Sequence, residues 1–225
     1  MVRLPFQDRA EAGQALAAAL DEYADRDDVI VLALPRGGVP VGHEVARKLD
    51  VPLDLMLVRK LGVPGHEELA MGAIASGGAR VLNDDVIQQL HIDQQALEKV
   101  IDKEQQELDR RGHAYRGDRP SPTLGDRCVI LIDDGLATGA TMAAAVEAVR
   151  QQSPARIVVA VPVAPPDTCY RLQQIADQVI ALATPQLFGG VGQWYQDFKQ
   201  TTDDEVRQLL DESHSRASRQ DDQLA

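Results

Sequence analysis

Short apolar runs bounded by turn residues constrain the fold of this chain more than any other feature. They cover residues 29–34, 53–58, 129–133 and 157–163, with a weaker fifth run at 178–183. Their hydrophobicity is continuous rather than alternating, which is typical of strands buried on both faces of a parallel sheet. Helical patterns separate them at residues 9–23, 39–49, 138–152 and 167–176. This alternation predicts a doubly wound α/β fold around a mainly parallel, five-stranded sheet.

The stretch between the second and third apolar runs, residues 60–126, is too long for a plain crossover. Two short segments, 70–74 and 79–82, flank Ser76-Gly77-Gly78, which predicts a β-hairpin. A long polar helix is expected from residue 93 to residue 114. We interpret 60–126 as a flap and helical insert within one domain of 225 residues, and not as a second domain.

Charge narrows the range of partners. Acidic residues outnumber basic ones by 35 to 23, so the formal net charge is −12. Such a surface repels nucleic-acid backbones at long range, and we expect no nucleic-acid partner. A small anionic ligand remains compatible, because helix N-termini and a few arginines act locally. Part of the acid excess lies in the C-terminal segment, which we interpret as a solvated face and a frayed end.

Cysteine usage and hydropathy bear on location. Neither Cys128 nor Cys169 lies in a CxxC or Cys/His spacing, so we expect reduced, buried thiols, as in the cytosol. The N-terminal residues lack the apolar core of a signal peptide, and no apolar run reaches membrane-spanning length. We therefore expect a cytoplasmic protein that makes no membrane contact.

The segment 129–142 carries the strongest functional signal. Its apolar strand ends in Asp133 and Asp134, and a turn with two glycines, Thr138 and Thr141 leads into an alanine-rich helix. In an open α/β sheet, ligands bind beyond the carboxyl ends of the strands. Free N–H groups at a helix start attract phosphate, while nearby carboxylates can accept hydrogen bonds from sugar hydroxyls. The loop therefore predicts a ribose 5-phosphate site; it matches neither the Walker nor the dinucleotide pattern.

Two further loops have related character. Arg36-Gly37-Gly38 follows the first apolar run as a glycine turn entering a helix, and Arg59-Lys60 follows the second. Either loop alone is weak evidence, because many turns read RGG and a basic pair is most often only solvated. Three loops suited to phosphate at one edge of a sheet are a stronger indication.

A third feature lies at residues 184–200. Aromatic residues make up only 4% of the chain, yet four of them gather here: Phe188, Trp194, Tyr195 and Phe198. Aromatic rings stack on nucleobases with a free energy of about 1–3 kcal/mol per base. The alternative is a hydrophobic cluster that holds the last helix in place, and the sequence leaves both interpretations open.

Together these segments resemble the type I phosphoribosyltransferases, and in particular a loosely characterised branch whose acceptor is undefined. The resemblance covers most of residues 29–200 and is strongest at 129–142. In that family an acidic pair holds the ribose hydroxyls of phosphoribosyl pyrophosphate (PRPP), and the following turn binds the 5-phosphate. The segment 184–200 resembles the base-side hood of the purine enzymes. The resemblance also implies Mg²⁺ as cofactor and makes a homodimer an expectation.

Carried over by position, the resemblance implies four groups of site residues. The catalytic group is Asp133, Asp134, Lys60 and Arg36. The ribose and 5-phosphate group is Asp133, Asp134, Ala137, Thr138, Gly139, Ala140 and Thr141. The pyrophosphate group is Arg36, Gly37, Gly38, Arg59 and Lys60. The base and hood group is Phe188, Trp194 and Tyr195, and the metal group is Asp133, Asp134 and Asp197.

The implied reaction transfers ribose 5-phosphate from PRPP to a nitrogenous base or amine and releases pyrophosphate. Part of 60–80 is expected to close over bound PRPP, since water must be excluded. Purine members often carry an acid where this chain has Ala137, so the general base is undefined. Its candidates are identified by residue type alone: His43, His66, His91 and His113.

Two alternatives remain at the level of sequence. One is a regulatory protein that binds PRPP or a nucleotide without turnover, which Ala137 favours slightly. The retained Arg36 loop and the Arg59-Lys60 pair favour turnover, because a monophosphate alone would not require them. A phosphohydrolase is the weakest alternative, since the sequence has no clustered His/Asp metal motif.

Overall fold

The computed structural model describes residues 3–224, with side chains through residue 216. Its main sheet has five strands in the order β2-β1-β6-β7-β8. The strands are β1 (Val29–Ala33), β2 (Leu53–Leu55), β6 (Cys128–Ile132), β7 (Arg156–Val163) and β8 (Gln178–Ala183). Every pairing in this sheet is parallel. The predicted five-stranded parallel sheet is therefore confirmed.

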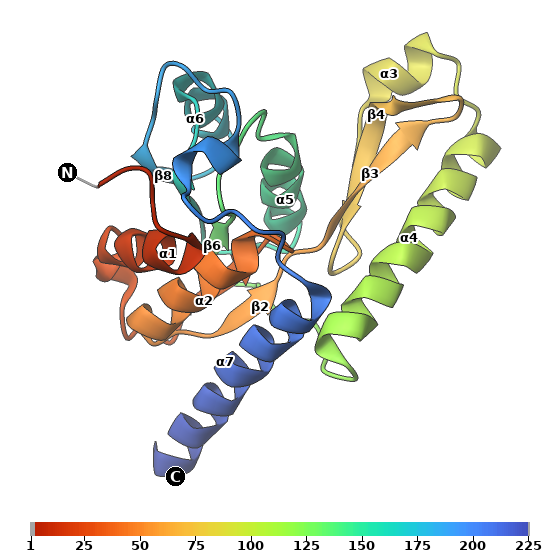
Figure 1. Ribbon diagram of the computed structural model, residues 1–225. Coiled ribbons are helices and arrows are strands. Elements are labelled where there is room, and N and C mark those ends of the chain that lie inside the picture. The colour runs from red at the N-terminus through yellow and green to blue at the C-terminus, as the bar shows by residue number, and fades with distance from the viewer. Residues whose placement is uncertain (1–2, 225) are drawn as a thin grey trace.

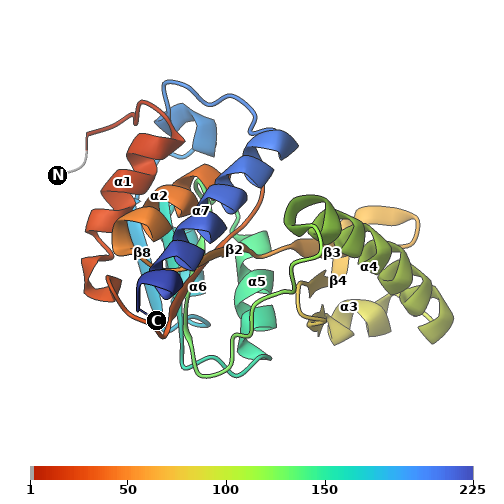
Figure 2. The same ribbon diagram turned by 90° about the horizontal axis from the view of Figure 1, so that it is seen from below.

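Helices cover both faces of the main sheet (Figures 1 and 2). One face carries α1 (Arg9–Ala18), α2 (Gly38–Leu49) and α7 (Asp203–Leu224). The other face carries α5 (Ala140–Arg150) and α6 (Pro166–Leu172). The first predicted helix is shorter than expected, because α1 ends at Ala18 and a separate 3₁₀ turn, Asp21–Tyr23, follows it.

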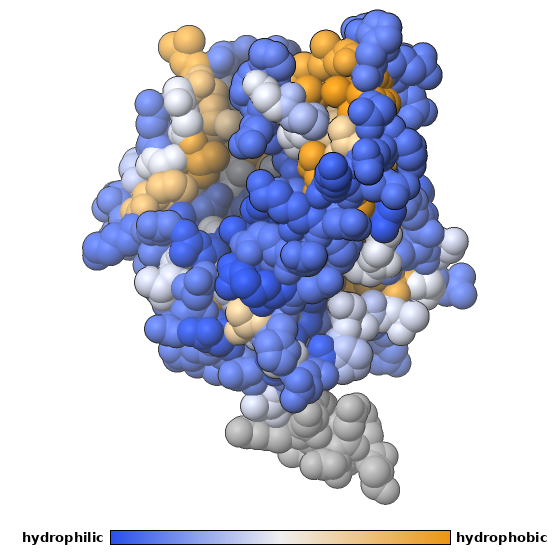
Figure 3. Space-filling model, turned by 90° about the vertical axis from the view of Figure 1, so that its right-hand side faces the viewer, coloured by the Kyte–Doolittle hydropathy of each residue, from blue (hydrophilic) through white to orange (hydrophobic). Residues whose placement is uncertain are grey.

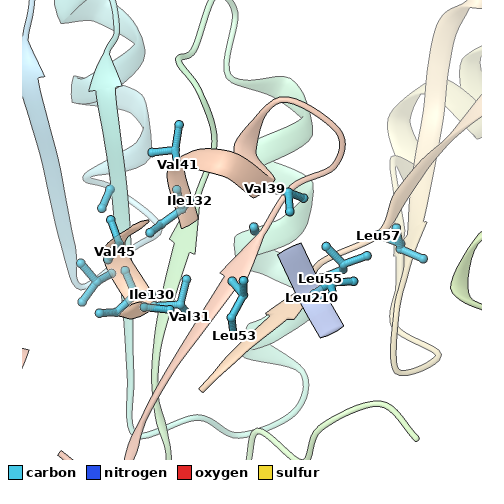
Figure 4. Close-up of a cluster of buried hydrophobic side chains, with 14 of the residues drawn as sticks. Val31, Val39, Val41, Val45, Leu53, Leu55, Leu57, Ile130, Ile132 and Leu210 are labelled. Atoms are coloured by element: carbon cyan, nitrogen blue, oxygen red, sulfur yellow. The ribbon is translucent and has the colours of Figure 1, made fainter. Parts of the chain in front are cut away.

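The core explains why these segments form strands. Figure 4 shows valine, leucine and isoleucine side chains of β1, β2, α2, β6 and α7 gathered in one cluster. Val31, Ile130 and Ile132 are fully buried there. A second cluster, on the opposite face, includes Leu131 and Val159 with side chains of α5 and α6. Since β6 is buried on both faces, its apolar character is continuous rather than alternating.

The segment between β2 and β6 forms an arm that projects from the main sheet (Figures 1 and 2). The arm comprises β3 (Val58–Val63), β4 (His66–Ala75), β5 (Arg80–Leu82), α3 (Asp84–Gln89) and α4 (Gln94–Arg116). β3, β4 and β5 make a separate antiparallel sheet. The predicted hairpin and long helix are both confirmed, as β4–β5 and as α4, whose N-cap Asp93 accepts a hydrogen bond from the Ala96 N–H.

Two expectations about these segments were wrong. The second strand of the main sheet is short, and residues 58–62, expected to be a loop at its end, belong to strand β3 of the arm. The C-terminal segment, expected to fray, begins α7 instead. Thr202 and Glu205 cap each other's backbone N–H groups at its start, and Val206 and Leu210 are buried against the rest of the molecule.

A buried ion pair joins the arm to the main sheet. Arg116, at the end of α4, donates to Asp54 of β2 at 2.6 Å and to the Leu55 carbonyl at 2.6 Å. Both charged side chains are 6% exposed. Figure 3 shows that the face of the molecule bearing the arm is largely hydrophilic, with apolar side chains gathered near its upper end. None of the described helices combines the length and apolar character needed to cross a membrane.

Candidate functional site

Two loops meet at the carboxyl edge of the main sheet. β1 and β6 are adjacent parallel strands, so the Arg36-Gly37-Gly38 loop and the acidic loop leave the sheet on the same side. A Cβ atom added to Gly37 would lie 2.1 Å from Asp134 Oδ2, and one added to Gly38 would lie 2.9 Å from Asp133 Cα. Only glycine permits this approach, because any side chain would collide with the acidic loop.

Burial dominates the electrostatics of the acidic pair. It raises the pKa of Asp133 well above its ordinary value, and the neighbouring charge of Asp134 raises it further. Burial also raises the pKa of Asp134, although Arg9 opposes that rise. Two adjacent carboxyls in this setting carry an energetic cost when both are ionised. A cationic ligand, or a ligand that donates hydrogen bonds, would relieve it.

Arg9, at the start of α1, is a site residue that the sequence reasoning missed. Its Nε and Nη2 atoms each lie 2.8 Å from Asp134 Oδ2, and Nη1 donates to the Lys199 carbonyl at 2.7 Å. Its guanidinium also lies 4.0 Å from the centroid of the Phe198 ring. Arg9 lies in no recognisable motif, and it reaches Asp134 only because α1 packs beside the hood segment.

The turn predicted to bind the 5-phosphate is braced by α6. Gly139 adopts φ +72° directly before α5, so the helix N-terminus opens onto this turn. Thr168 donates to the Ala137 carbonyl at 2.8 Å, and Arg171 donates to the Thr138 carbonyl at 3.0 Å. Ala137, Thr138 and Ala140 are exposed, which leaves this helix start accessible to a small anion. Nothing in the sequence signalled Thr168 or Arg171.

Arg36 lies at the other side of the glycine loop. The peptide bond between Pro35 and Arg36 is cis. The Arg36 guanidinium lies 3.7 Å from Asp203 Oδ1 at the start of α7, and Tyr115 of α4 donates to the same oxygen at 2.6 Å. Arg36 is partly exposed, and its single carboxylate partner lies at the long end of an ion pair.

The hood segment packs against the acidic loop. Phe188 and Trp194 stack with their centroids 6.3 Å apart, and Tyr195 stacks on Phe198 at 5.1 Å. The Tyr195 hydroxyl donates to the Asp134 carbonyl at 2.5 Å, and a Cβ at Gly135 would lie 2.7 Å from Val191. Tyr195 is buried and so belongs to the packing of the loop, whereas Phe188 and Trp194 are partly exposed.

The cations of the second predicted loop lie in the arm. Arg59 is paired with Glu104 of α4, and Lys60 donates to the Glu68 carbonyl at 3.0 Å. Both line a cavity of about 270 Å³ between β3 and α4. No contact joins either residue to Asp133 or Asp134 within the described side chains.

Metal and proton-transfer candidates are dispersed. Among the described residues, no three His, Cys, Asp or Glu side chains gather as a metal site. Asp197 pairs with Lys199 at 2.8 Å rather than with the acidic loop. His43 lies against Ser213 of α7, with its Nδ1 atom 3.1 Å from the hydroxyl. The other three candidate histidines, His66, His91 and His113, are exposed.

The two predicted thiols behave as expected. Cys128 and Cys169 are both free and buried. Burial raises the pKa of each thiol, so neither carries the thiolate character of a nucleophile or a metal ligand.

The fold and these loops define a doubly wound α/β protein with an acidic loop and a glycine loop facing each other at the carboxyl edge of its sheet. The model of the phosphoribosyl transferase domain family matches residues 6–190. The chain belongs to this family, which confirms the resemblance found in the sequence and identifies the protein as a member of a transferase family.

Individual relatives agree. The chain is 48% identical over 209 residues to "Putative phosphoribosyl transferase Rv0571c" of Mycobacterium tuberculosis H37Rv, and equally to its counterpart MT0597 of strain CDC 1551. The aligned region is 93% of this chain but 47% of each relative, so the chain spans about half the length of these curated relatives. The crystal structure of TT1426 from Thermus thermophilus is 45% identical, with a TM-score of 0.82 over 92% of this chain and 98% of that one.

Proposed function

We propose that the protein is a Mg²⁺-dependent phosphoribosyltransferase that moves ribose 5-phosphate from PRPP to a nitrogenous base or amine and releases pyrophosphate. The observation that carries the proposal is the contact between the Gly37-Gly38 turn and the Asp133-Asp134 pair. The open start of α5 lies in the same loop as the acids. One short arc of the sheet edge thus offers glycine amides, two carboxylates and a helix N-terminus to a single sugar phosphate.

The donor set at the acids fits magnesium. Mg²⁺ prefers carboxylate oxygens, keeps several waters, and is usually bound by one or two carboxylates together with substrate phosphates. Asp133 and Asp134 would supply those carboxylates, and relief of their mutual repulsion would favour the cation. Asp197 remains a predicted ligand, although it is paired with Lys199. When bound, the metal would neutralise charge on the departing pyrophosphate.

The chain's own residues would then divide the remaining tasks. Residues 137–141 would hold the 5-phosphate with backbone N–H groups and threonine hydroxyls. Arg36 would leave its long contact with Asp203 to meet the pyrophosphate, supported by the amides of Gly37 and Gly38. Phe188 and Trp194 would offer a stacking face to the acceptor, since each is partly exposed.

The arm would act as the flap that excludes water. Lys60 is exposed and bonded only to a backbone carbonyl, so it is available for a pyrophosphate if the arm bends toward the sheet edge. Arg59 would have to exchange Glu104 for the ligand. Limited proteolysis within residues 60–80 tests closure: PRPP with Mg²⁺ should slow cleavage, and unchanged cleavage would disprove the flap.

One observation favours a second function, a PRPP or nucleotide sensor without turnover. Ala137 occupies the place where an acid is expected, and none of the four candidate histidines contacts the acidic loop. A sensor would bind PRPP as tightly as an enzyme but release no pyrophosphate with any acceptor. The two functions therefore differ in turnover and not in affinity.

Calorimetric titration of PRPP with and without Mg²⁺ tests the proposal, using wild type and Asp133→Asn/Asp134→Asn. Wild type should bind in a Mg²⁺-dependent manner, and the double variant should lose about 100-fold in affinity, or about 2.7 kcal/mol. Matched substitutions on the exposed surface of α4, Asp102→Asn/Asp109→Asn, should leave binding unchanged.

A base-dependent assay of pyrophosphate release then separates the functions. Release only with an acceptor supports the transferase, binding without release supports the sensor, and release without an acceptor indicates a hydrolase. Failure of the wild type to bind PRPP would reject both the transferase and the PRPP sensor.

A further inference from the structure

The two adjacent aspartates are held in different ways. Asp134 meets a guanidinium through its carboxylate, the Tyr195 hydroxyl through its carbonyl oxygen, and Asp133 Oδ1 through its own N–H at 2.8 Å. Asp133 has no ion pair among the described side chains. Neighbouring positions of one sequence motif therefore differ in how much of their bonding capacity the protein itself uses.

Arg9 is fixed as firmly as the acid it binds. Its side chain is 12% exposed and that of Asp134 is 13% exposed. One nitrogen donates to the Lys199 carbonyl, and the guanidinium lies over the Phe198 ring. A guanidinium so stacked and bonded on several sides has little freedom to leave its carboxylate for a ligand.

From this asymmetry, and resting on the proposed function, we infer that the acids divide their roles. Asp133 is the carboxylate that meets the ribose hydroxyls and the metal, while Arg9 holds Asp134 as an anchor of the loop. Arg9 is thus a positioning residue, supplied by the N-terminal helix, that sets the loop against Gly37. Equal participation of the two acids would require Asp134 to break a partly buried, two-nitrogen contact first.

A double-mutant cycle in thermal unfolding tests the anchor without any ligand. Arg9→Gln and Asp134→Asn should each lower the melting temperature, and the double variant should melt no lower than the less stable single variant. Arg26 and Asp28 form a matched control, since they make the same two-nitrogen contact but with side chains 41% and 48% exposed. Their cycle should be nearly additive. Additivity in the Arg9 cycle would overturn the anchor.

Titration with ribose 5-phosphate, which carries the hydroxyls and the phosphate but no pyrophosphate, tests the division of roles. In the presence of Mg²⁺, Asp133→Asn should weaken affinity at least tenfold, and Asp134→Asn about threefold or less. Arg9→Lys keeps the charge but loses the planar two-nitrogen contact, so it should recover the melting temperature only in part. A loss of affinity in Asp134→Asn equal to that in Asp133→Asn, with an unchanged melting temperature, would overturn the inference.

The outcomes separate this inference from the function on which it rests. If wild type binds ribose 5-phosphate but PRPP yields no turnover, the transferase fails and the division of roles is still decided by the two variants. If wild type binds neither sugar phosphate, the ligand role of Asp133 is disproved together with the function. The unfolding cycle then decides whether Arg9 anchors Asp134.

Discussion

At the edge of the main sheet, one cation serves two acids, whereas the arm provides its charged groups with partners of its own. Arg9 contacts Asp134 and leaves Asp133 without an ion pair among the described residues. In the arm, Arg59 is held by Glu104, and Arg116 is held by Asp54 where the arm joins the sheet. An unbalanced group is costly for stability and useful for binding, so the contrast separates a region built for a ligand from one built for support.

The largest effect should come from the junction between the two regions. Arg116→Gln leaves the carboxylate of Asp54 buried without its partner and removes the bond to the Leu55 carbonyl. Breaking one side of a buried ion pair costs about 3–5 kcal/mol, and we expect that loss in the free energy of unfolding measured with urea.

Arg110→Gln provides the control for that loss. Arg110 pairs with Glu107 on the same helix, but its side chain is 66% exposed. Exposed pairs contribute about 0–1 kcal/mol. If Arg116→Gln were no more destabilising than Arg110→Gln, the junction would not support the arm, and the contrast between the two regions would fail.

The sequence predicted the ligand region better than the supporting region. β1, β6 and β7 are buried on both faces, so their apolar runs indicate a parallel sheet, and the acids and glycines follow at its edge. β3 carries Arg59 and Lys60 and is only half buried, so its residues look like a loop with two cations. Local pattern does not reveal that a half-exposed strand pairs with another strand of the arm.

The same limit explains what was missed at the site itself. Asp133 and Asp134 stand in a local motif, so their position at the edge followed from their neighbours in sequence. Arg9 lies 125 residues from Asp134 along the chain and meets it only after folding. Thr168 likewise braces Ala137 from a different helix. Partners supplied by distant elements carry no signal in spacing or composition.

A smaller effect should appear in the pH dependence of stability. The folded-state pKa of Asp133 is raised by burial and by Asp134, so its contribution to stability is fully present below the ordinary value of about 4 and is lost as the pH rises. Asp133→Asn should therefore raise the free energy of unfolding at pH 7 by about 1–2 kcal/mol. It should have little effect at pH 4.

Urea unfolding of both proteins across this pH range gives the measurement, with the exposed Asp102→Asn as a control whose curve should follow the wild type. Mg²⁺ should stabilise wild type at pH 7 but not Asp133→Asn, because the cation relieves the repulsion that the substitution removes. A wild type that gains stability with pH relative to Asp133→Asn would contradict the unbalanced charge at the sheet edge.

The smallest effects should separate the two neighbouring cations of β3. Arg59→Gln should cost about 1 kcal/mol in stability, because its pair with Glu104 is partly buried, while Lys60→Gln should stay within about 0.5 kcal/mol. If the arm closes over the ligand, Lys60→Gln should weaken PRPP two- to fivefold and leave ribose 5-phosphate unchanged, since only PRPP carries a pyrophosphate. Titration of both ligands measures this. Equal weakening of the two would place Lys60 away from the pyrophosphate, and no change in either would leave the arm a purely supporting region.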